Sequence, residues 1–464
     1  MDYLRINSIA KAIYLLLTGI TILNPKLEAQ TTVLHDYVQE GLGNNLALQQ
    51  KIDNYSMSLQ VLREAKGMFY PSLSFNARYT VARGGRVIEF PAGDMLNPVY
   101  QTLNQLTGEP FPLLENQEFM FYRPTEQETK IQLVQPIVNS QLYFNKKIQS
   151  TLTETERIDA EVYKCYLIKE IKTAYYSYLK AVRLASLIAN TRILLEENIR
   201  VNESLYAHDK VTIDAVLRSQ SELSKLESKQ AESDKLVKIS AAYFNFLLNR
   251  QQNAEIIDDS LLVIQEWLFN AEETASRAVK NREELLMLEN YNKAADLNYK
   301  MVRYNKLPTL LGVAEYGIQG EDYNLDENSD YLMASVVFRW NIFSGFQNNA
   351  KIKQARIQKE MTEKRYEEVK SSIRLEATQA WYDLQASVKE IETSRKQSET
   401  MRNAFEIINK RYGQGQVSFV EYLDARNALV SADESLIINQ YDYLIKMAEL
   451  ERVSNLYNDD ATHP

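Results

Sequence analysis

The sequence predicts a mainly α-helical fold with a small β part, arranged as two tandem repeats of long coiled-coil helices with two strands each. Helix-breaking residues are scarce, since the 464 residues include 14 Gly and 10 Pro, well below average usage. No Gly or Pro occurs between Ile137 and Leu307. Two distant segments, 205–223 and 411–429, carry the same residue pattern at a constant offset. These observations favour long, uninterrupted helices in a duplicated chain.

The repeated pattern predicts a tight tip between two long antiparallel helices in each repeat. In the second repeat, Gly413 and Gly415 provide the backbone freedom to end one helix, and Ser418 is the expected N-cap of the next. In the first repeat, Asp209 stands at the position of Gly415, and Thr212 supplies the capping hydroxyl. The matched positions include Tyr206 with Tyr412, Val211 with Val417, and Ile213 with Phe419.

Apolar residues in these helices recur at alternating spacings of three and four. Such spacing averages near 3.5 and predicts coiled-coil packing. A helix of about 65 residues would be roughly 100 Å long, farther than one globular core can cover. The clearest seam consists of Tyr366, Val369, Ile373, Ala377, Ala380, Leu384, Val388 and Ile391, and it resumes at Met401, Phe405, Ile408 and Tyr412.

Four short segments alternate apolar and polar residues and are predicted to be strands. In the first, Leu73, Phe75 and Tyr79 alternate with polar residues such as Ser74 and Asn76. The predicted strands lie at about 72–83, 128–137, 309–319 and 331–342. The residues expected on their apolar faces include Leu73, Phe75, Tyr79, Leu133, Tyr316, Val336, Phe338 and Trp340.

The duplication and the loops set the expected domain boundaries. Residues 84–127 contain five prolines and are predicted to form a long irregular surface loop. The helical tips are expected at about 207–212 and 413–418. We expect a first repeat over 30–270, a second over 271–457 and a short tail over 458–464.

The first 29 residues have the layout of a secretory signal peptide. Arg5 and Lys11 precede an apolar run from Ala12 to Leu23, and cleavage is expected after Ala29. A run of about 12 apolar residues is too short to span a bilayer as a helix. We therefore expect residues 1–29 to direct export of the mature chain.

Composition excludes several classes of function. The formal net charge of -9 argues against a nucleic-acid partner, which requires a basic face. The single cysteine, Cys165, lies in a helical pattern and is expected to be a buried apolar residue. The three histidines share no ligand spacing, and no phosphate-binding glycine loop is present. We expect no catalytic, cofactor-binding or metal-binding residues and no enzymatic activity.

The strands leave two alternatives open. Ten-residue strands with one apolar and one polar face fit a bilayer-spanning barrel, but they also fit a soluble antiparallel sheet packed on helices. Export, together with Tyr79, Tyr316 and Trp340, residue types enriched at membrane interfaces, favours the barrel. Four strands cannot close a barrel, and open edges are not tolerated in lipid. Several chains would therefore share the sheet.

From about residue 32 to 457, the ordered features resemble the TolC-like outer membrane efflux proteins of Gram-negative bacteria. Each repeat has an Asn-containing helix start, a helix ending at Pro, a strand, a loop, a strand, a long helix, a tip and a helix. The strand-to-helix turns read VNS at 138–140 and FSG at 343–345. The best single match is YGQGQVSFVEYLDARNAL at the second tip.

The resemblance implies a homotrimer in the outer membrane. Its 12-stranded transmembrane β-barrel would continue as an α-helical barrel into the periplasm. The implied role is a passive exit duct of a tripartite efflux or type I secretion system, without a cofactor. The implied partners are outer membrane lipid, a periplasmic adaptor (membrane fusion) protein and an inner-membrane pump. The alternative, from the residues alone, is a soluble periplasmic coiled-coil adaptor or scaffold protein.

The resemblance also assigns roles at the tips. The family closes its periplasmic tip with Tyr, Arg and Asp side chains, but Val417 occupies the arginine position and Asn45 replaces a family proline in the first helix. The first tip's acidic position falls on Ala215, beside Asp214. Acidic residues from three chains would form a cation-binding constriction. The implied gate residues are Tyr412, Glu421, Asp424 and Asp214. The implied adaptor-docking residues are Asp209, Val211, Thr212, Gly413, Gly415, Val417 and Ser418.

Overall fold

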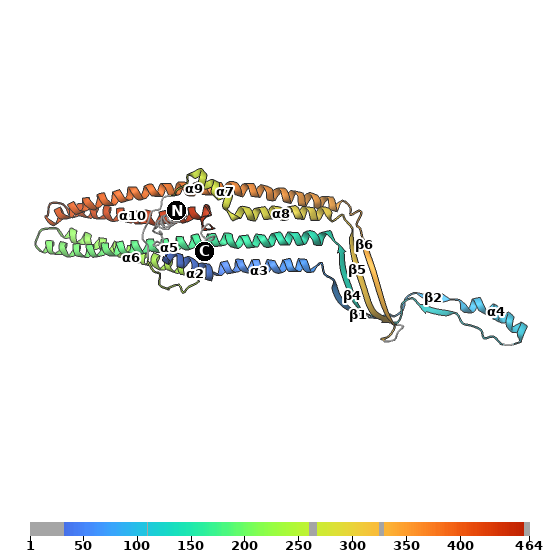
Figure 1. Cartoon of the computed structure of the whole chain (residues 1–464). Helices are drawn as coiled ribbons and strands as arrows, with labels where there is room; N and C mark the ends of the chain where they lie inside the picture. The colour runs from blue at the N-terminus through green and yellow to red at the C-terminus, as the bar shows by residue number, and fades with distance from the viewer. Residues whose placement is uncertain (1–31, 109, 259–266, 324–328, 459–464) are drawn as a thin grey trace, which may run out of the picture. The chain divides into compact units, whose positions relative to one another are not determined.

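The computed structural model describes residues 32–108, 110–258, 267–323 and 329–458 (Figure 1). The predicted signal peptide, 1–29, lies outside the described residues, as does the predicted tail beyond Asn458. The mainly helical prediction with a small β part is confirmed. In chain order the elements are α2 (Thr32–Asn44), α3 (Leu46–Gly67), β1 (Ser72–Val81), β2 (Val87–Phe90), α4 (Ala92–Thr107), β3 (Gln117–Met120), β4 (Thr125–Val138), α5 (Ser140–Ala207), α6 (Ile213–Leu247), α7 (Ala271–Asn281), α8 (Glu283–Tyr304), β5 (Thr309–Gly320), β6 (Asp330–Arg339), α9 (Gln347–Gly413), α10 (Phe419–Val453) and the 3-10 helix η1 (Leu456–Asn458).

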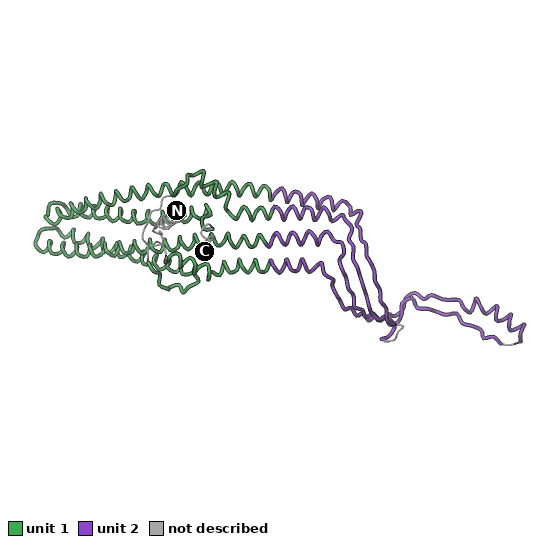
Figure 2. The backbone as a smooth tube through the Cα atoms, in the orientation of Figure 1, with its two compact units in different colours: residues 1–57, 154–291, 362–464 green, residues 58–153, 292–361 purple. Residues whose placement is uncertain are grey.

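The chain forms two compact units that do not follow the two repeats (Figure 2). Each unit gathers corresponding parts of both repeats. The first unit contains 1–57, 154–291 and 362–464, and the second contains 58–153 and 292–361. Helices α3, α5, α8 and α9 each begin in one unit and end in the other. Each unit is described separately below.

The first unit is built on the long helices. Helix α5 has 68 residues and α9 has 67, so each is roughly 100 Å long along its whole course. Each is followed by a 35-residue helix, α6 or α10, that runs back beside it (Figure 1). The predicted helix, tip and helix order is therefore present in both repeats.

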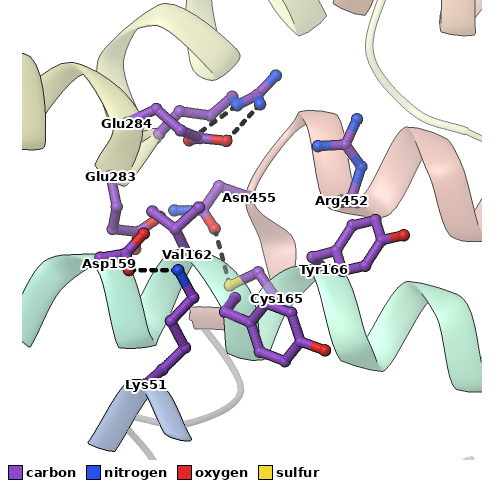
Figure 3. A pocket seen from close by; sticks show the side chains of 11 residues that line it. Lys51, Asp159, Val162, Cys165, Tyr166, Glu283, Glu284, Arg452 and Asn455 are labelled. Atoms are coloured by element: carbon purple, nitrogen blue, oxygen red, sulfur yellow. Dashed lines mark hydrogen bonds and ion pairs between the residues drawn. The ribbon is translucent and has the colours of Figure 1, made fainter. Parts of the chain in front are cut away.

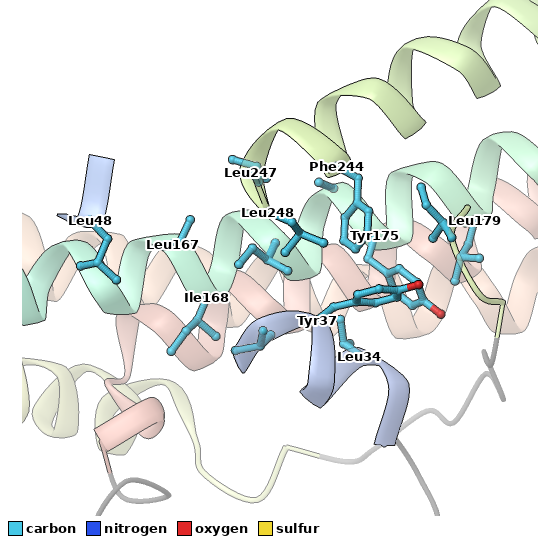
Figure 4. Packing of buried hydrophobic residues seen from close by; sticks show 14 of the residues in the cluster. Leu34, Tyr37, Leu48, Leu167, Ile168, Tyr175, Leu179, Phe244, Leu247 and Leu248 are labelled. Atoms are coloured by element: carbon cyan, nitrogen blue, oxygen red, sulfur yellow. The ribbon is translucent and has the colours of Figure 1, made fainter. Parts of the chain in front are cut away.

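Two apolar cores hold the helices of the first unit together. In one, Tyr37 of α2 packs edge-on against Phe244 of α6 at 5.0 Å between ring centroids and lies 5.9 Å from Tyr175 of α5 (Figure 4). The other core follows the predicted seam of α9, where Ile373, Ala377, Ala380, Leu384 and Ile391 are buried.

The seam prediction is wrong at one position. Val388 is 42% exposed, and the neighbouring Ser387 is buried in its place, donating a hydrogen bond to the Leu384 carbonyl. The buried positions keep alternating spacings of three and four through Ala377, Ala380, Leu384, Ser387 and Ile391, so the 3.5-residue repeat falls on Ser387 rather than on Val388. Further along, Ser394 and Ser398 are also buried.

Both repeats break their first helix at the same aligned place. Asn45 separates α2 from α3, and its side-chain oxygen accepts the backbone N–H of Leu48 at 3.0 Å, as an N-cap does. Its amide donates to the Leu247 carbonyl at 2.9 Å. Arg282 separates α7 from α8 and forms ion pairs with Glu284 and Glu376. Asn45 thus starts a helix by capping where the family uses proline.

The second unit contains a four-stranded antiparallel sheet in the order β1-β4-β5-β6. The register places Phe75 opposite Ile131, Ile131 opposite Tyr316 and Tyr316 opposite Leu332, which gives one apolar face across all four strands. Side chains on this face are strongly exposed, including Phe75 at 70%, Val336 at 69% and Leu332 at 78%. The predicted alternation is therefore correct, and nothing within the described chain covers the face.

Two strand predictions are corrected by the structure. Strand β6 ends at Arg339, so Trp340 does not lie on it. The Trp340 indole instead donates to the Lys306 carbonyl at 3.0 Å, which takes the chain out of the ladder. Strand β4 begins at Thr125 rather than 128, because Thr125 pairs with Val81 at the end of β1.

The predicted irregular loop over 84–127 is ordered. Strands β2 and β3 pair with each other, and α4 lies between them. The described chain therefore has six strands rather than four. Pro98, inside α4, argued against a helix, but the asparagines of the segment hold it to the return chain. Among the helices in the described part of the chain, none is both long enough and apolar enough to cross a bilayer.

Candidate functional site: the paired helical tips

The two tips turn with the same backbone geometry. Asp209 and Gly415 both adopt positive φ, at 51° and 72°, the conformation that ends a helix. In each tip the backbone N–H of the next residue donates back to a carbonyl of the preceding helix, Lys210 to Leu205 and Gln416 to Arg411, both at 2.9 Å. Gly413, predicted to share this role, is the last residue of α9 and has no positive φ. Asp209 thus ends the long helix of the first tip through its positive φ, as Gly415 does in the second tip.

The capping residues differ between the tips. Ser418 is the N-cap of α10, and its hydroxyl accepts the Glu421 backbone N–H at 3.2 Å, as predicted. Thr212 occupies the N-cap position of α6, but its hydroxyl donates to the Asp214 carboxylate instead of accepting a backbone N–H. The predicted Thr212 cap is therefore correct in position and wrong in its bond.

An aromatic cluster joins the two tips. Tyr412 at the end of α9 stacks on Tyr422 of α10 with 4.8 Å between ring centroids, and Phe419 lies 6.0 Å from Tyr412. Ala215 of α6, the family's acidic position, is buried in the same cluster. Val211 and Val417, predicted to dock an adaptor, pack partly buried against it. A carboxylate at Ala215 would be desolvated here, which fits its replacement by a small apolar side chain.

A chain of buried polar groups runs beside the aromatic cluster. The Tyr412 hydroxyl donates to the Asn202 side-chain oxygen on α5. The Asn202 amide donates to Ser219 of α6 at 2.8 Å and to Asn198 at 3.1 Å. Burial raises the pKa of Tyr412 and of Tyr422, so both hydroxyls remain protonated donors at neutral pH. The second helical pair is thus hydrogen-bonded to the first through neutral groups.

One buried arginine lies next to this network. Arg426 of α10 is 5% exposed, and its guanidinium is 3.6 Å from the Glu222 carboxylate of α6 and 2.9 Å from the Asn427 side-chain oxygen. Among the described residues, its Nε and Nη1 atoms have no hydrogen-bond partner. Burial accordingly lowers the pKa of Arg426 from its usual value. The tip therefore contains an arginine, although not at the family's position, which Val417 occupies.

The structure brings together only one of the four predicted gate residues with this network. Tyr412 is buried at its centre. Glu421 and Asp424 are exposed on α10, and Asp214 is exposed on α6, 3.8 Å from Arg218. The acidic residues therefore face outward from the single chain.

Sequence reasoning missed the buried polar members of the site. A detectable signal was present, because Asn198 and Asn202 continue the alternating spacing set by Ile188 and Leu195 along the buried face of α5. Polar residues in an apolar seam are expected to bond to one another or to a facing helix. Arg426 likewise follows Phe419 and Tyr422 at spacings of three and four.

The polar face of the sheet in the second unit carries a mixed cluster of charges. Lys130 of β4 forms ion pairs with Glu315 of β5 at 3.1 Å and with Glu128 at 2.9 Å. Arg78 of β1 lies 3.6 Å from Glu126 and from Glu128. The charged side chains of this face are suited to contact with water, whereas the side chains of the opposite face are apolar.

A cavity of about 280 Å³ lies elsewhere in the first unit (Figure 3). Lys51 points toward Asp159, with 2.6 Å between amine and carboxylate, and Cys165 lies 3.7 Å from the Asn455 side-chain oxygen. Burial raises the pKa of Cys165 to about 12, so its thiol is inert at neutral pH. Within the described ranges, no group of three or more His, Cys, Asp or Glu side chains could hold a metal ion.

Comparison with known proteins bears on this geometry. Residues 274–456 match the family model for outer membrane efflux protein. No match was found among curated protein sequences. Among similar solved structures, a membrane protein from Pseudomonas aeruginosa has 16% sequence identity and a TM-score of 0.76, with 92% of this chain and 93% of that chain covered. The CmeC outer membrane channel of Campylobacter jejuni has 13% identity and a TM-score of 0.77, with 92% of this chain and 86% of that chain covered. The open state of the MtrE outer membrane channel of Neisseria gonorrhoeae has 15% identity and a TM-score of 0.72, with 91% of this chain and 88% of that chain covered. The chain thus contains an outer membrane efflux protein domain and has the fold of TolC-like outer membrane channels.

Proposed function

We propose that the protein is the outer membrane exit duct of a tripartite efflux or type I secretion system in a Gram-negative bacterium. The observation that carries the proposal is the four-stranded sheet, whose apolar face is exposed and whose polar face holds the Lys130 cluster. An apolar face of this kind fits lipid, and a charged face fits a water-filled lumen. The similarity to outer membrane channels supports the same conclusion.

The duct is a homotrimer. Within the described part of the chain, β1 and β6 are the edges of the sheet, and each is paired on one side only. Unpaired edges are too costly in lipid, and four strands cannot close on themselves. Three chains of four strands give a 12-stranded transmembrane barrel. The long helices of the three chains then form an α-helical barrel in the periplasm.

The duct is passive and depends on partners. A periplasmic adaptor contacts the tips at exposed residues such as Asp209, Thr212 and Gly415, and an inner-membrane pump supplies the energy. Val211 and Val417 are partly buried in the tip cluster, so they support the docking surface more than they form it. The exported substrate passes through the lumen.

The test is made on full-length protein purified in detergent from the outer membrane fraction. We expect a trimer by mass measurement and stepwise single-channel conductance in planar bilayers. Recovery as a soluble periplasmic monomer would overturn the proposal in favour of a coiled-coil adaptor or scaffold. A trimer that inserts into bilayers but never conducts would agree with the membrane location and contradict the proposal that the protein is a duct.

The acidic tip residues are proposed to form a cation-binding constriction. Glu421 and Asp424 are exposed in the single chain, and three copies would place six carboxylates around a narrowed pore. Carboxylates at close range favour a bound counterion. In a salt gradient, Glu421→Ala plus Asp424→Ala should shift the reversal potential from cation preference toward zero. An unchanged reversal potential would agree with the duct but contradict the assignment of these residues to its constriction.

A further inference from the structure

The segment between β1 and β4 is built onto the sheet rather than attached by a free linker. Backbone hydrogen bonds continue from the end of the sheet into the β2–β3 ribbon, from Ala82 to Pro124 and from Phe121 to Arg86, both at 2.9 Å. Figure 1 shows the ribbon and α4 following on from that end of the sheet. The segment therefore projects from a fixed place on each chain.

Helix α4 turns its polar side toward its own chain. The Asn97 amide donates to the Leu114 carbonyl at 2.9 Å, and the Asn97 oxygen accepts the Leu114 N–H at 2.7 Å. Asn104 donates to the Phe111 carbonyl at 3.1 Å, and Asn116 accepts the Gly93 N–H at 3.0 Å. These bonds, together with the stacking of Tyr100 on Phe111 at 6.0 Å between ring centroids, tie the helix to the return chain.

The apolar side of α4 faces away from the chain. Met95, Val99 and Leu106 are 64%, 53% and 78% exposed. With Ala92 and Thr102 they follow each other at spacings of three, four, three and four, as in the seam of a coiled coil, and Leu96, 41% exposed, lies beside them. The exposed stripe is therefore shaped for other helices.

Apart from the stacked rings of Tyr100 and Phe111, the described part of the segment has no buried apolar cluster to stabilise it. Helix α4 has 16 residues, little more than the length below which isolated helices are marginal in water, and Pro98 inside it removes a helical hydrogen bond. The β2–β3 ribbon exposes apolar side chains on both faces, Val87 on one and Ile88 and Phe119 on the other. A two-stranded ribbon is at best marginally stable alone. A partner on the exposed stripe would therefore add apolar burial that the segment lacks alone.

Charge argues against lipid as that partner. Residues 92–107 contain no Lys or Arg, and residues 84–127 carry two arginines against six carboxylate residues. Helices that lie on anionic membranes are instead rich in Lys and Arg. A second copy of this chain, with the same stripe on its own α4, matches the spacing of the exposed stripe and its lack of charged side chains.

We propose that α4 packs along its Met95, Val99 and Leu106 stripe against α4 of the other two copies, forming a three-helix bundle beyond the outer end of the shared barrel. The inference rests on the proposed trimer, since β1 and β4 would carry the three segments to the same end of one barrel. In such a bundle the three seams meet at the symmetry axis, and identical residues face one another. The bundle would narrow the outer mouth of the duct.

The test is disulfide crosslinking of full-length trimers in detergent. Val99→Cys places a thiol on the stripe, and Gln101→Cys, the matched control, places one on the opposite side of the same exposed helix. The native Cys165 is buried and inert, so it does not compete. On oxidation we expect Val99→Cys to give crosslinked dimers, with two of the three copies joined in each trimer, and Gln101→Cys to give none.

Each outcome is decisive for one claim. Intact trimers of Val99→Cys that do not crosslink, or that crosslink no better than Gln101→Cys, overturn the bundle and leave the duct standing. Failure to isolate trimers from the unmodified protein instead removes the proposed function. In vesicles, quenching of a fluorophore on Val99→Cys by brominated acyl chains would show that α4 meets lipid, which also overturns the bundle.

Discussion

Replacing Phe75 and Phe338 together by Asp is expected to remove the protein from the outer membrane fraction. Both side chains lie on the apolar face of the sheet, 70% and 61% exposed in the single chain. Each substitution loses about 2 kcal/mol of apolar transfer free energy. Each also adds up to about 2 kcal/mol for a charge on the lipid face. Three copies multiply both costs, so the sheet is expected to fail to insert. Fractionation of cells that express the variant measures this.

Matched substitutions on the polar face separate membrane contact from a general effect on strand stability. Ser74 neighbours Phe75 on β1, Ser335 lies near Phe338 on β6, and both point to the charged face. Ser74→Asp plus Ser335→Asp is expected to insert and to conduct. If the apolar-face variant also remains as trimers in the outer membrane, its face does not contact lipid, and the sheet must instead pack on protein.

The strands and long helices could be predicted because burial of one face makes apolar residues recur at a regular spacing in the sequence of each. Alternation around Phe75 marks one wet and one dry face, and the seam through Ile373 and Leu384 marks a helix packed on helices. Both signals are local. Strand ends are less well marked, so Trp340, which continues the alternation beyond Arg339, was misplaced on β6.

The ordered loop and the buried polar groups at the tips could not be predicted in the same way. In α4, Pro98 and the polar residues suggested an irregular chain, whereas hydrogen bonds from Asn97 and Asn104 to chain about 7–17 residues away fix the helix. At the tips, Asn202 has a role only because Tyr412, 210 residues later, donates to it. Pairings at such separation depend on the folded arrangement of the helices, and no local pattern encodes them.

Removing the Tyr412 hydroxyl is the second change with a large expected effect, and it should raise the open probability of the tip. Tyr412→Phe keeps the ring that stacks on Tyr422 but leaves the buried Asn202 oxygen without this donor. An unsatisfied buried acceptor costs about 1–3 kcal/mol. If the duct opens by separating the two helical pairs, only the closed tip bears that cost, because water reaches Asn202 once the pairs part. The open probability should then rise about 5- to 150-fold.

The duplicated chain provides its own control for this experiment. Tyr206 is the counterpart of Tyr412 in the first repeat, but it is 45% exposed, whereas Tyr412 is 8% exposed. Tyr206→Phe removes the same hydroxyl from a solvated position and is expected to leave single-channel open probability unchanged. Equal behaviour of the two variants would show that the bond from Tyr412 to Asn202 stabilises the fold without holding the tip shut. An effect confined to Tyr412→Phe would place the closing contact inside one chain, between α5 and α9, and would explain how a tip with Val417 at the family's arginine position can still close.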